Sequence, residues 1–336
     1  MSKKIRFAVI GAGHIGKKHA TMIKNNSDAE LCAIIDIRPK EDLALEDINV
    51  SFFSSLDEFL AGNIKVDVIN IATPNGLHAS HAIECINNNL HVVIEKPMAL
   101  KKNDVLKIID AANEKDRKVF AVMQNRYSPP AKWAKELMDK KILGKIYIVQ
   151  FSFYWNRDER YYTKDSWHGS KELDGGTLFT QFSHFIDILY WLFGDIENIK
   201  SKICDFNHPG LTDFEDSGII TFDFIKGGIG SINFSTSAWD KNMESSMTIL
   251  AEKGTIKIGG QYMEEVEYCH IKDYKMPKLS LTNQPNNYGH YKGSAANHEY
   301  IISNVIDVLK GRGNITTEAS EALKVVDIIE RIYKES

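Results

Sequence analysis

The chain has 336 residues, of which 43% are hydrophobic and 26% charged, and its formal net charge is −4. This charge provides no general field that attracts polyanions, so we expect no nucleic-acid or membrane partner. No apolar stretch approaches the roughly 20 residues that cross a bilayer, and Met1–Lys4 does not begin a signal peptide, so we expect a cytoplasmic protein. The cysteines are far apart and lack metal-ligand spacing, which predicts reduced thiols and no metal site. They are Cys32, Cys85, Cys204 and Cys269.

Residues 1–123 alternate short apolar runs with helical patterns, which is typical of βαβ units and a parallel sheet. Between these runs, apolar residues recur at helical spacing, and Ser55 with Glu58 forms a capping box. We therefore predict an N-terminal dinucleotide-binding Rossmann domain over residues 1–123. The expected strands are Ile5–Ile10, Leu31–Ile35, Val66–Ala72, His91–Ile94 and Val119–Met123.

Residues 124–336 follow a different hydrophobic period. Apolar residues alternate strictly in several neighbouring segments, which indicates a half-buried antiparallel sheet. Gly227-Gly228 and Ala251–Gly254 fit hairpin turns, and two amphipathic helices end the chain. We therefore predict a C-terminal α/β domain over 124–336 with a large, mostly antiparallel open sheet. The alternating residues are Tyr147, Val149, Phe151, Phe153, Ile220, Phe222, Phe224, Ile232 and Phe234.

A glycine motif, Gly11-Ala12-Gly13-His14-Ile15-Gly16, follows the first expected strand and opens a helix. In this context the glycines allow a tight turn, close approach of a pyrophosphate and close helix packing. Asp36 ends the second strand, where a carboxylate binds the adenosine ribose and repels a 2′-phosphate, so NAD is favoured over NADP. Arg38 is a second cofactor candidate, because a guanidinium there can accept a phosphate or stack on adenine.

Two further segments follow strands at the edge where open α/β sheets bind ligands. They are Thr73-Pro74-Asn75, with His78 close behind, and Glu95-Lys96-Pro97. The Lys96 ammonium is suited to stabilise an alkoxide that develops as hydride leaves a substrate carbon. Pro97 would fix the backbone, and a cis bond there is one way to do so. An ordinary surface turn with a solvated ion pair is the alternative interpretation.

Residues Thr177–Phe193 form an expected helix that is apolar nearly all round and therefore buried. Its polar exceptions Thr180, His184 and Asp187 have the spacing of a single stripe. We interpret His184 as a general base and Asp187 as its orienting partner, because imidazole suits proton transfer near neutral pH. The alternative is a purely structural hydrogen-bond network.

Residues 155–171 combine aromatic and basic side chains. Such a cluster suits a nucleotide sugar with a carboxylate, because rings stack on the base or sugar and cations pair with phosphate or carboxylate. The alternative is an aromatic-rich loop whose charges lie in solvent. The side chains are Trp155, Arg157, Arg160, Tyr161, Tyr162, Lys164 and Trp167.

Together these motifs resemble the Gfo/Idh/MocA family of oxidoreductases over essentially the whole chain. The resemblance implies a Rossmann domain that binds NAD(P), and a C-terminal domain whose open sheet forms a homodimer or homotetramer and whose inner face holds substrate. It also implies catalysis by Lys96 and His184. Many members have an aspartate four residues before the histidine, where this chain has Thr180. Thr180 cannot be a carboxylate partner, which puts the proton-relay form of the mechanism in doubt.

Three shorter sequence segments are similar to those of the UDP-N-acetyl-2-amino-2-deoxyglucuronate dehydrogenases. The matching segments are Gln124–Pro130, Tyr161-Tyr162 and Thr180–His184. The likeness implies NAD-dependent oxidation of the sugar 3-hydroxyl in bacterial surface-polysaccharide synthesis, with 2-oxoglutarate in some members reoxidising bound NADH. It adds Gln124, Trp167 and His168 as cofactor contacts, although His168 stands where an arginine is usual. The predicted substrate contacts are Arg157 and Arg160 from the basic cluster and, from the matching segments, Asn125, Arg126, Tyr161, Tyr162, Thr180, Ser183 and His184.

Two other functions fit the same motifs. One is a different sugar or inositol dehydrogenase of the family. The other is a dinucleotide-sensing regulator, because a fold does not dictate function. Such a regulator can discard the lysine and histidine, and this chain keeps both Lys96 and His184.

Overall fold

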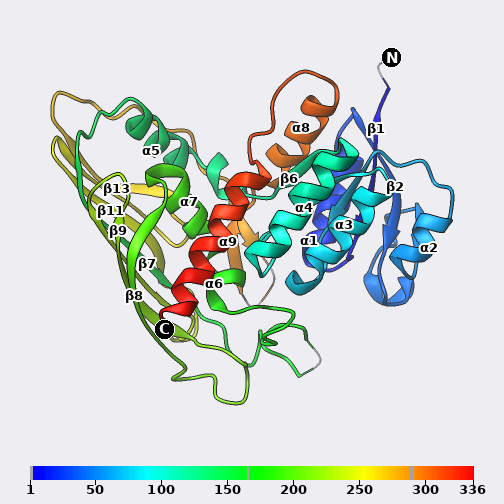
Figure 1. Ribbon diagram of the computed structural model, residues 1–336, viewed down its shortest axis with the longest axis horizontal. Helices are drawn as coiled ribbons and strands as arrows, with labels where there is room; N and C mark the ends of the chain where they lie inside the picture. The colour runs from blue at the N-terminus through cyan, green and yellow to red at the C-terminus, as the bar shows by residue number, and fades with distance from the viewer. Residues whose placement is uncertain (1–2, 165, 288, 290) are drawn as a thin grey trace. The chain divides into compact units, whose positions relative to one another are not determined.

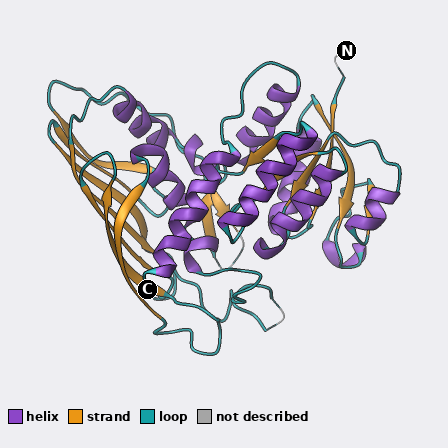
Figure 2. Ribbon diagram, viewed as in Figure 1, coloured by secondary structure: helices purple, strands orange, loops and turns teal. Residues whose placement is uncertain are grey.

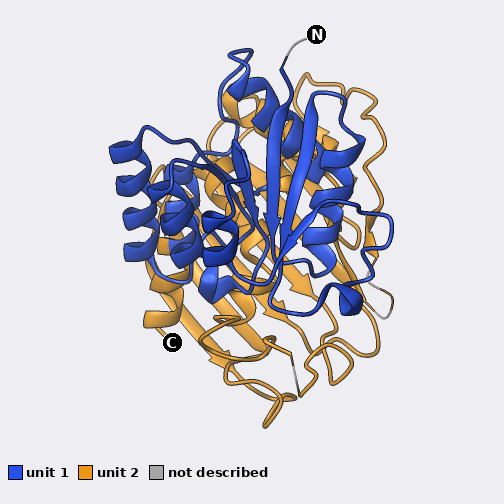
Figure 3. Ribbon diagram, turned by 90° about the vertical axis from the view of Figure 1, so that its right-hand side faces the viewer, with its two compact units in different colours: residues 1–123, 298–326 blue, residues 124–297, 327–336 orange. Residues whose placement is uncertain are grey.

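The computed structural model describes residues 3–164, 166–287, 289 and 291–336. Met1 and Ser2, to which part of the signal-peptide prediction refers, lie outside the described residues. The chain forms two compact units, one of residues 1–123 and 298–326 and the other of residues 124–297 and 327–336 (Figure 3). Residues 298–326 cluster with the first unit, and the functional division at residue 123 stays a prediction.

The first unit contains the expected parallel sheet, with strand order β3-β2-β1-β4-β5-β6. Its strands β1, β2 and β6 are labelled in Figure 1. Helices lie on both sides of its strands in Figure 3, which explains why β4 is buried at every position. The strands are β1 (Ile5–Ile10), β2 (Ala29–Ile35), β3 (Ser51–Phe53), β4 (Val68–Ile71), β5 (His91–Ile94) and β6 (Val119–Ala121). The helices are α1 (His14–Asn25), α2 (Leu56–Ala61), α3 (His78–Asn87), α4 (Lys102–Lys115) and α8 (His298–Leu309), with short turns η1 (Lys40–Leu43) and η2 (Asn75–Leu77).

Two local signals in this unit are confirmed. Ser55 caps α2 through a 3.1 Å hydrogen bond from the Glu58 amide, as the capping box predicts. The Lys96–Pro97 peptide bond is cis. One feature was not predicted: Thr317, from the C-terminal part of the chain, pairs with Ala121 at the end of β6 through backbone and side-chain hydrogen bonds.

The second unit contains a mixed sheet with strand order β13-β12-β11-β7-β10-β9-β8. Strands β7 and β10 are parallel and the other neighbours in this order are antiparallel, so the predicted mostly antiparallel sheet is confirmed. The strands are β7 (Ile146–Tyr154), β8 (Ile196–Cys204), β9 (Ser217–Phe224), β10 (Ile229–Ser235), β11 (Glu244–Ala251), β12 (Gly254–Gly259) and β13 (Glu265–Ile271); β14 (Pro285–Asn287) and β15 (Lys292–Ala295) form a separate hairpin.

Helices of the second unit lie along one face of this sheet (Figure 2). They are η3 (Gln124–Tyr127), α5 (Pro129–Asp139), α6 (Thr177–Thr180) and α7 (Ser183–Phe193), and α9 (Ala319–Lys334) ends in this unit. The inner face is aromatic: Phe153 stacks on Phe182 and Phe185, with ring centroids 5.4 and 4.5 Å apart. None of the helices in the described ranges combines the length and apolarity that a bilayer span requires.

The expected single helix over Thr177–Phe193 is wrong, because the chain breaks into α6 and α7. Tertiary contacts cause the break. Gln181 is held by Arg157 and by the Tyr161 hydroxyl, and the Phe182 amide reaches back five residues to the Thr177 carbonyl. The polar stripe is therefore interrupted: Thr180 lies on α6, whereas His184 and Asp187 lie on α7.

Candidate functional site

The glycine turn of the first unit leaves open space at the start of α1. Gly11 has a φ of 87°, and a Cβ there would lie 2.5 Å from the Ala72 carbonyl oxygen. A Cβ on Gly16 would lie 1.7 Å from the Gly11 carbonyl oxygen, so both positions exclude side chains. A Cβ on Gly13 would meet nothing within 4 Å in the described part of the chain. Gly13 is thus the position at which a diphosphate can approach the helix N-terminus.

Asp36, at the end of β2, is tied to the same turn. Its carboxylate accepts a 2.6 Å hydrogen bond from the Ala12 amide and is paired with the half-exposed Arg38 guanidinium at 2.9 Å. Burial raises the pKa of Asp36, but these hydrogen bonds outweigh it and lower the pKa overall. The carboxylate is therefore ionised and held next to the glycine turn, as ribose binding requires. Direct contact of Asp36 and Arg38 with a cofactor stays a prediction.

His78 joins the two other predicted cofactor segments. Its buried ring lies 2.7 Å from the Pro97 carbonyl oxygen through Nδ1 and 2.8 Å from the Thr73 carbonyl oxygen through Nε2. Carbonyl oxygens only accept, so both hydrogen bonds form only when the imidazole carries two protons. Burial lowers the pKa of His78, and the two carbonyls oppose that shift. His78 therefore fixes the loops after β4 and β5 relative to one another. Of the other residues predicted there, Asn75 is buried and Pro74 partly exposed.

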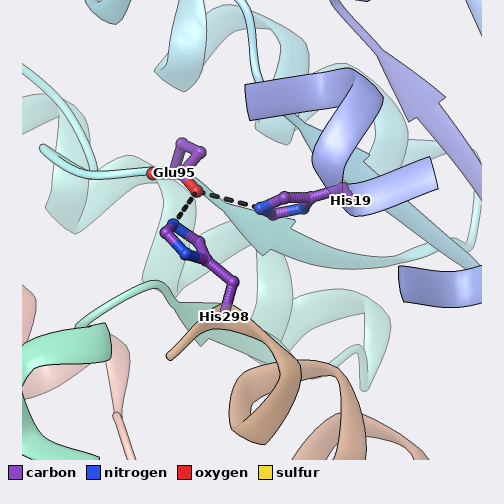
Figure 4. Close-up of side chains that lie close together, drawn as sticks. All are labelled: His19, Glu95 and His298. Atoms are coloured by element: carbon purple, nitrogen blue, oxygen red, sulfur yellow. Dashed lines mark hydrogen bonds and ion pairs between the residues drawn. The ribbon is translucent and has the colours of Figure 1, made fainter. Parts of the chain in front are cut away.

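A buried carboxylate precedes Lys96. Glu95 Oε1 lies 2.9 Å from His19 Nε2 and 3.3 Å from His298 Nε2, and Oε2 accepts a 3.1 Å hydrogen bond from the Lys96 amide (Figure 4). Burial raises the pKa of Glu95, but the two histidines outweigh it and hold the pKa well below its usual range. Asn70 Nδ2 lies 2.8 Å from His19 Nδ1, so both ring nitrogens of His19 are held by neighbouring side chains.

This network fixes the backbone of Lys96 to three elements of the first unit. His19 belongs to α1, Asn70 to β4 and His298 to α8. His19, Glu95 and His298 could together hold a metal ion, but the lengths of their contacts are those of ordinary hydrogen bonds. Sequence reasoning missed His19, Asn70 and His298, because an isolated polar residue within an apolar pattern does not reveal its distant partners.

In the second unit, His184 lies at the start of α7. Its Nε2 is 3.4 Å from the Ser294 hydroxyl and 3.5 Å from the Gln124 amide nitrogen, and Gln124 donates to Ser294 at 3.0 Å. His184 is buried, with 4% of its surface exposed. The imidazole is therefore positioned by neutral polar groups, which leave it able to accept a proton. Ser294, on β15, was missed by the sequence analysis.

Asp187, which we expected to orient His184, forms a buried ion pair with Arg126. Two parallel hydrogen bonds of 2.9 and 2.6 Å join the guanidinium and the carboxylate, and the guanidinium also lies over the Trp191 ring. A bidentate buried pair is geometrically specific. It fixes η3 against α7 and thereby holds Gln124 beside His184. The predicted substrate contact of Arg126 stays a prediction.

Thr180 contacts a carboxylate that the sequence analysis did not assign. Its hydroxyl donates to the backbone carbonyl and to the carboxylate of Asp174, and Asp174 also accepts a 2.9 Å hydrogen bond from the Gly169 amide. Asp174 is buried and precedes Gly175-Gly176, the turn that opens α6. Thr180 is therefore not itself a carboxylate, as the sequence shows, but its hydroxyl is bonded to the Asp174 carboxylate.

Arg157 is a buried cation surrounded by neutral groups. Its guanidinium donates to Gln181, Asn242 and the carbonyls of Asn156 and Lys292. Among the described residues, no carboxylate is bonded to it, and burial lowers its pKa. The guanidinium carbon lies 4.9 to 5.1 Å from the centroids of three rings, those of Trp155, Tyr161 and Tyr291. A buried cation without a bonded anion is electrostatically suited to an anionic ligand.

The other predicted contacts of residues 155–171 divide into buried and exposed groups. Tyr161 is buried, its hydroxyl lies 3.0 Å from His168 Nδ1, and Trp167 packs against the His168 ring. Tyr162 is buried against His208. Arg160 is exposed and its charge is met by Asp158 and Asp240.

Two further predicted substrate residues are buried polar groups. Ser183 has no exposed surface and Asn125 only 5%. Within the described ranges, Ser183 Oγ and Asn125 Oδ1 have no hydrogen-bond partner. Buried polar atoms of this kind generally bind a ligand or an ordered water, so both stay candidates.

Comparison with known proteins gives matches over most of the chain. Residues 5–123 match the model of the oxidoreductase family GFO_IDH_MocA with its NAD-binding Rossmann fold, and residues 131–257 match the GFO/IDH/MocA C-terminal domain. The WlbA dehydrogenase of Bordetella pertussis, solved with NADH and UDP-GlcNAcA, is 31% identical and has a TM-score of 0.88, with 99% of this chain and 96% of that chain covered.

Two further relatives show the range of activities. The WlbA dehydrogenase of Chromobacterium violaceum, solved with the same two ligands, is 30% identical with a TM-score of 0.89, and 100% of this chain and 94% of that chain are covered. The 2,7-anhydro-N-acetylneuraminate hydratase of Escherichia coli is 28% identical over 76% of this chain and 68% of its own length. These matches confirm the predicted fold, the NAD cofactor and the oxidoreductase class. Lys96 and His184 belong to different units, so their convergence on one pocket stays a prediction.

Proposed function

This chain belongs to the Gfo/Idh/MocA family of NAD-binding oxidoreductases, and on that premise we propose that it oxidises the 3-hydroxyl of a UDP-linked N-acetylated amino sugar uronate to the 3-keto sugar. The observation that carries the proposal is the likeness to the two WlbA dehydrogenases, which hold NADH and UDP-GlcNAcA and match this chain nearly end to end. The product would serve the synthesis of bacterial surface polysaccharide, and 2-oxoglutarate is the proposed oxidant for bound NADH.

The catalytic residues in this proposal are Lys96 and His184. The glycine turn and Asp36 would hold NAD, whose nicotinamide ring would supply the acceptor for the hydride that leaves the sugar carbon. The Lys96 ammonium donates a hydrogen bond to the substrate oxygen and stabilises its alkoxide character. His184 takes the hydroxyl proton on the imidazole nitrogen that faces Gln124 and Ser294. The network around Glu95 supports this step by fixing the Lys96 backbone.

The anionic character of the substrate is supported by Arg157. Its buried positive charge has no bonded carboxylate in the described part of the chain, and the Tyr161 and Tyr291 rings flank it. A uronate carboxylate or a diphosphate supplies the missing negative charge, and aromatic rings pack on a sugar face. We therefore assign Arg157 and Tyr161 to the substrate rather than to the cofactor.

The proposed oligomer rests on the outer face of the large sheet. Ile148, Ile229 and Leu250 lie side by side in register on β7, β10 and β11, and all three are exposed by 38% or more. A row of adjacent exposed apolar side chains marks an interaction surface. We propose that a second copy covers it, giving a homodimer or homotetramer, and light scattering of the purified protein would measure that mass.

The direct test of the substrate is NADH absorbance after addition of UDP-GlcNAcA, with and without 2-oxoglutarate, beside a panel of free sugars. Formation of NADH, or of a keto sugar in the presence of 2-oxoglutarate, with the UDP-linked uronate alone supports the proposal. Turnover of free sugars instead would support the second candidate, a different sugar dehydrogenase of the family, which the sequence likeness to enzymes of other names favours. Turnover of neither substrate class would contradict both candidates.

A further inference from the structure

The loop between β8 and β9 brings one histidine and two aspartates together, outside the proposed catalytic site. Asp205, His208 and Asp216 each place one potential metal ligand atom within 4.8 Å of the other two. All three belong to the second unit. Asp205 is exposed, whereas His208 and Asp216 are fully buried. The cluster therefore combines one solvent-exposed carboxylate with two buried side chains.

Both carboxylates are oriented by backbone amides of the same loop. Asp205 Oδ1 accepts a 2.9 Å hydrogen bond from the His208 amide. Asp216 Oδ2 accepts hydrogen bonds of 2.9 and 2.6 Å from the amides of Phe206 and Asn207. One oxygen of Asp216 is therefore fixed by the loop, and the carboxylate also lies near the side chains of Ser217 and Ser237.

The His208 side chain provides a second, independent indication that this cluster binds a ligand. The side chain has no exposed surface, and neither Nδ1 nor Nε2 has a hydrogen-bond partner among the described residues. Asp216 Oδ1 likewise has no partner of good geometry in that part of the chain. Buried polar atoms are nearly always satisfied, so a buried imidazole nitrogen and carboxylate oxygen that lie close together without partners indicate a ligand or an ordered water between them. A cation satisfies both at once, because each group offers it a lone pair.

We propose that Asp205, His208 and Asp216 bind a divalent transition-metal ion, with Zn²⁺ as the representative. One imidazole and two carboxylates form a mixed nitrogen and oxygen donor set, which suits Zn²⁺ better than the all-oxygen sites of Ca²⁺ or Mg²⁺. Solvent on the side of the exposed Asp205 completes the coordination. The backbone amides that hold the carboxylates act as the outer shell that orients metal ligands.

The bound ion would stabilise the segment that carries Tyr161 and Tyr162, to which we assign substrate binding. The His208 ring packs against Tyr162, with centroids 5.2 Å apart. Asp213, on the same loop, donates its amide to the Gly169 carbonyl and accepts from the Lys171 amide. The loop thus contacts Tyr162, Gly169 and Lys171 of that segment. This consequence rests on the proposed function, whereas metal binding itself does not.

The test is zinc binding by the full-length chain after chelation and dialysis, followed by calorimetry with ZnCl₂ and by metal analysis. We expect about one Zn²⁺ per chain, and more than about 100-fold weaker binding in H208Q and in D205N, because each variant loses a direct ligand. The matched controls are H270Q, an exposed histidine on β13, and H298Q, from the buried network of the first unit. Both should bind zinc as the wild type does.

Three outcomes would overturn the proposal: no stoichiometric zinc in the wild type, unchanged binding in H208Q or D205N, or loss of binding in H298Q alone. The first would indicate that a water molecule bridges His208 and Asp216. Because H208Q alters a buried residue, circular dichroism must confirm its fold, and D205N, at an exposed position, decides the matter if H208Q does not fold. Zinc binding is measured without substrate, so failure of the proposed dehydrogenase activity leaves this result unaffected.

Discussion

His19 Nε2 and Glu95 Oε1 lie 2.9 Å apart in the interior of the first unit, which ties the helix behind the glycine turn to the residue before Lys96. His298 completes the network from α8. A parallel sheet brings its strand ends together at one edge, but it does not fix the loops that follow them. The Glu95 carboxylate provides that fixation for the loop after β5.

Replacing Glu95 by glutamine should lower both stability and turnover. The amide cannot accept from His19, His298 and the Lys96 amide as a carboxylate does, so we expect a loss of about 1–3 kcal/mol in the free energy of unfolding. The turnover number should fall more than the KM for NAD rises, because the Lys96 backbone loses its anchor. Denaturant unfolding and steady-state kinetics measure the two effects. The exposed Glu299→Gln is the matched control, and equal behaviour of the two variants would refute the role of Glu95.

Two variants of the glycine turn should separate an effect on stability from an effect on NAD binding. Gly16→Ala places a methyl group 1.7 Å from the Gly11 carbonyl oxygen, so it should unfold or strongly destabilise the first unit. Gly13→Ala meets open space and Gly13 has a φ of −69°, so it should fold with nearly wild-type stability yet bind NAD at least tenfold more weakly. Thermal unfolding and NADH fluorescence titration separate the cases. Wild-type NAD affinity in Gly13→Ala would place the diphosphate elsewhere.

Arg157 should affect the nucleotide sugar and not the cofactor. Arg157→Met removes the buried positive charge, so we expect the KM for the UDP-linked uronate to rise by at least tenfold while the Kd for NAD stays unchanged. The exposed Lys171→Met, in the same segment, should change neither constant. If the Arg157 variant lost affinity for NAD instead, this residue would belong to the cofactor site.

Glu215 should make the second unit sensitive to pH. Burial raises the pKa of its carboxyl to about 7, and Thr177 and Tyr333 bond to it. A carboxyl whose pKa is higher in the folded chain than the roughly 4.3 of an unfolded one favours folding at low pH, and this contribution is lost as pH rises from about 4.3 to about 7. Glu215→Gln should gain on the order of 1–3 kcal/mol relative to the wild type over that window. Unfolding temperatures of both proteins between pH 4.5 and 8 would show it, and parallel curves would contradict it.

The sequence was most informative where the local pattern and the tertiary structure agree. The strands β1 and β5 have the predicted bounds, and the Gly227-Gly228 hairpin joins β9 to β10, because period and turn chemistry are local. The break between α6 and α7 was not predictable, since contacts of Gln181 with Arg157 and Tyr161 impose it on a continuous apolar pattern. The partners of Glu95 and Thr180 were missed for the same reason: each depends on a residue that only the folded chain brings close.

The central claim is that Lys96 and His184 act on the same substrate hydroxyl. The most direct test is the burst of NADH in the first turnover, measured by stopped-flow absorbance with saturating NAD and UDP-GlcNAcA for the wild type, Lys96→Ala, His184→Ala and the exposed control Lys101→Ala. We predict that both site variants bind NAD normally but lose the rate of this step by several orders of magnitude, since the lost interactions belong to the transition state, while the control behaves as the wild type does. A wild-type burst in either Lys96→Ala or His184→Ala would contradict the proposed mechanism.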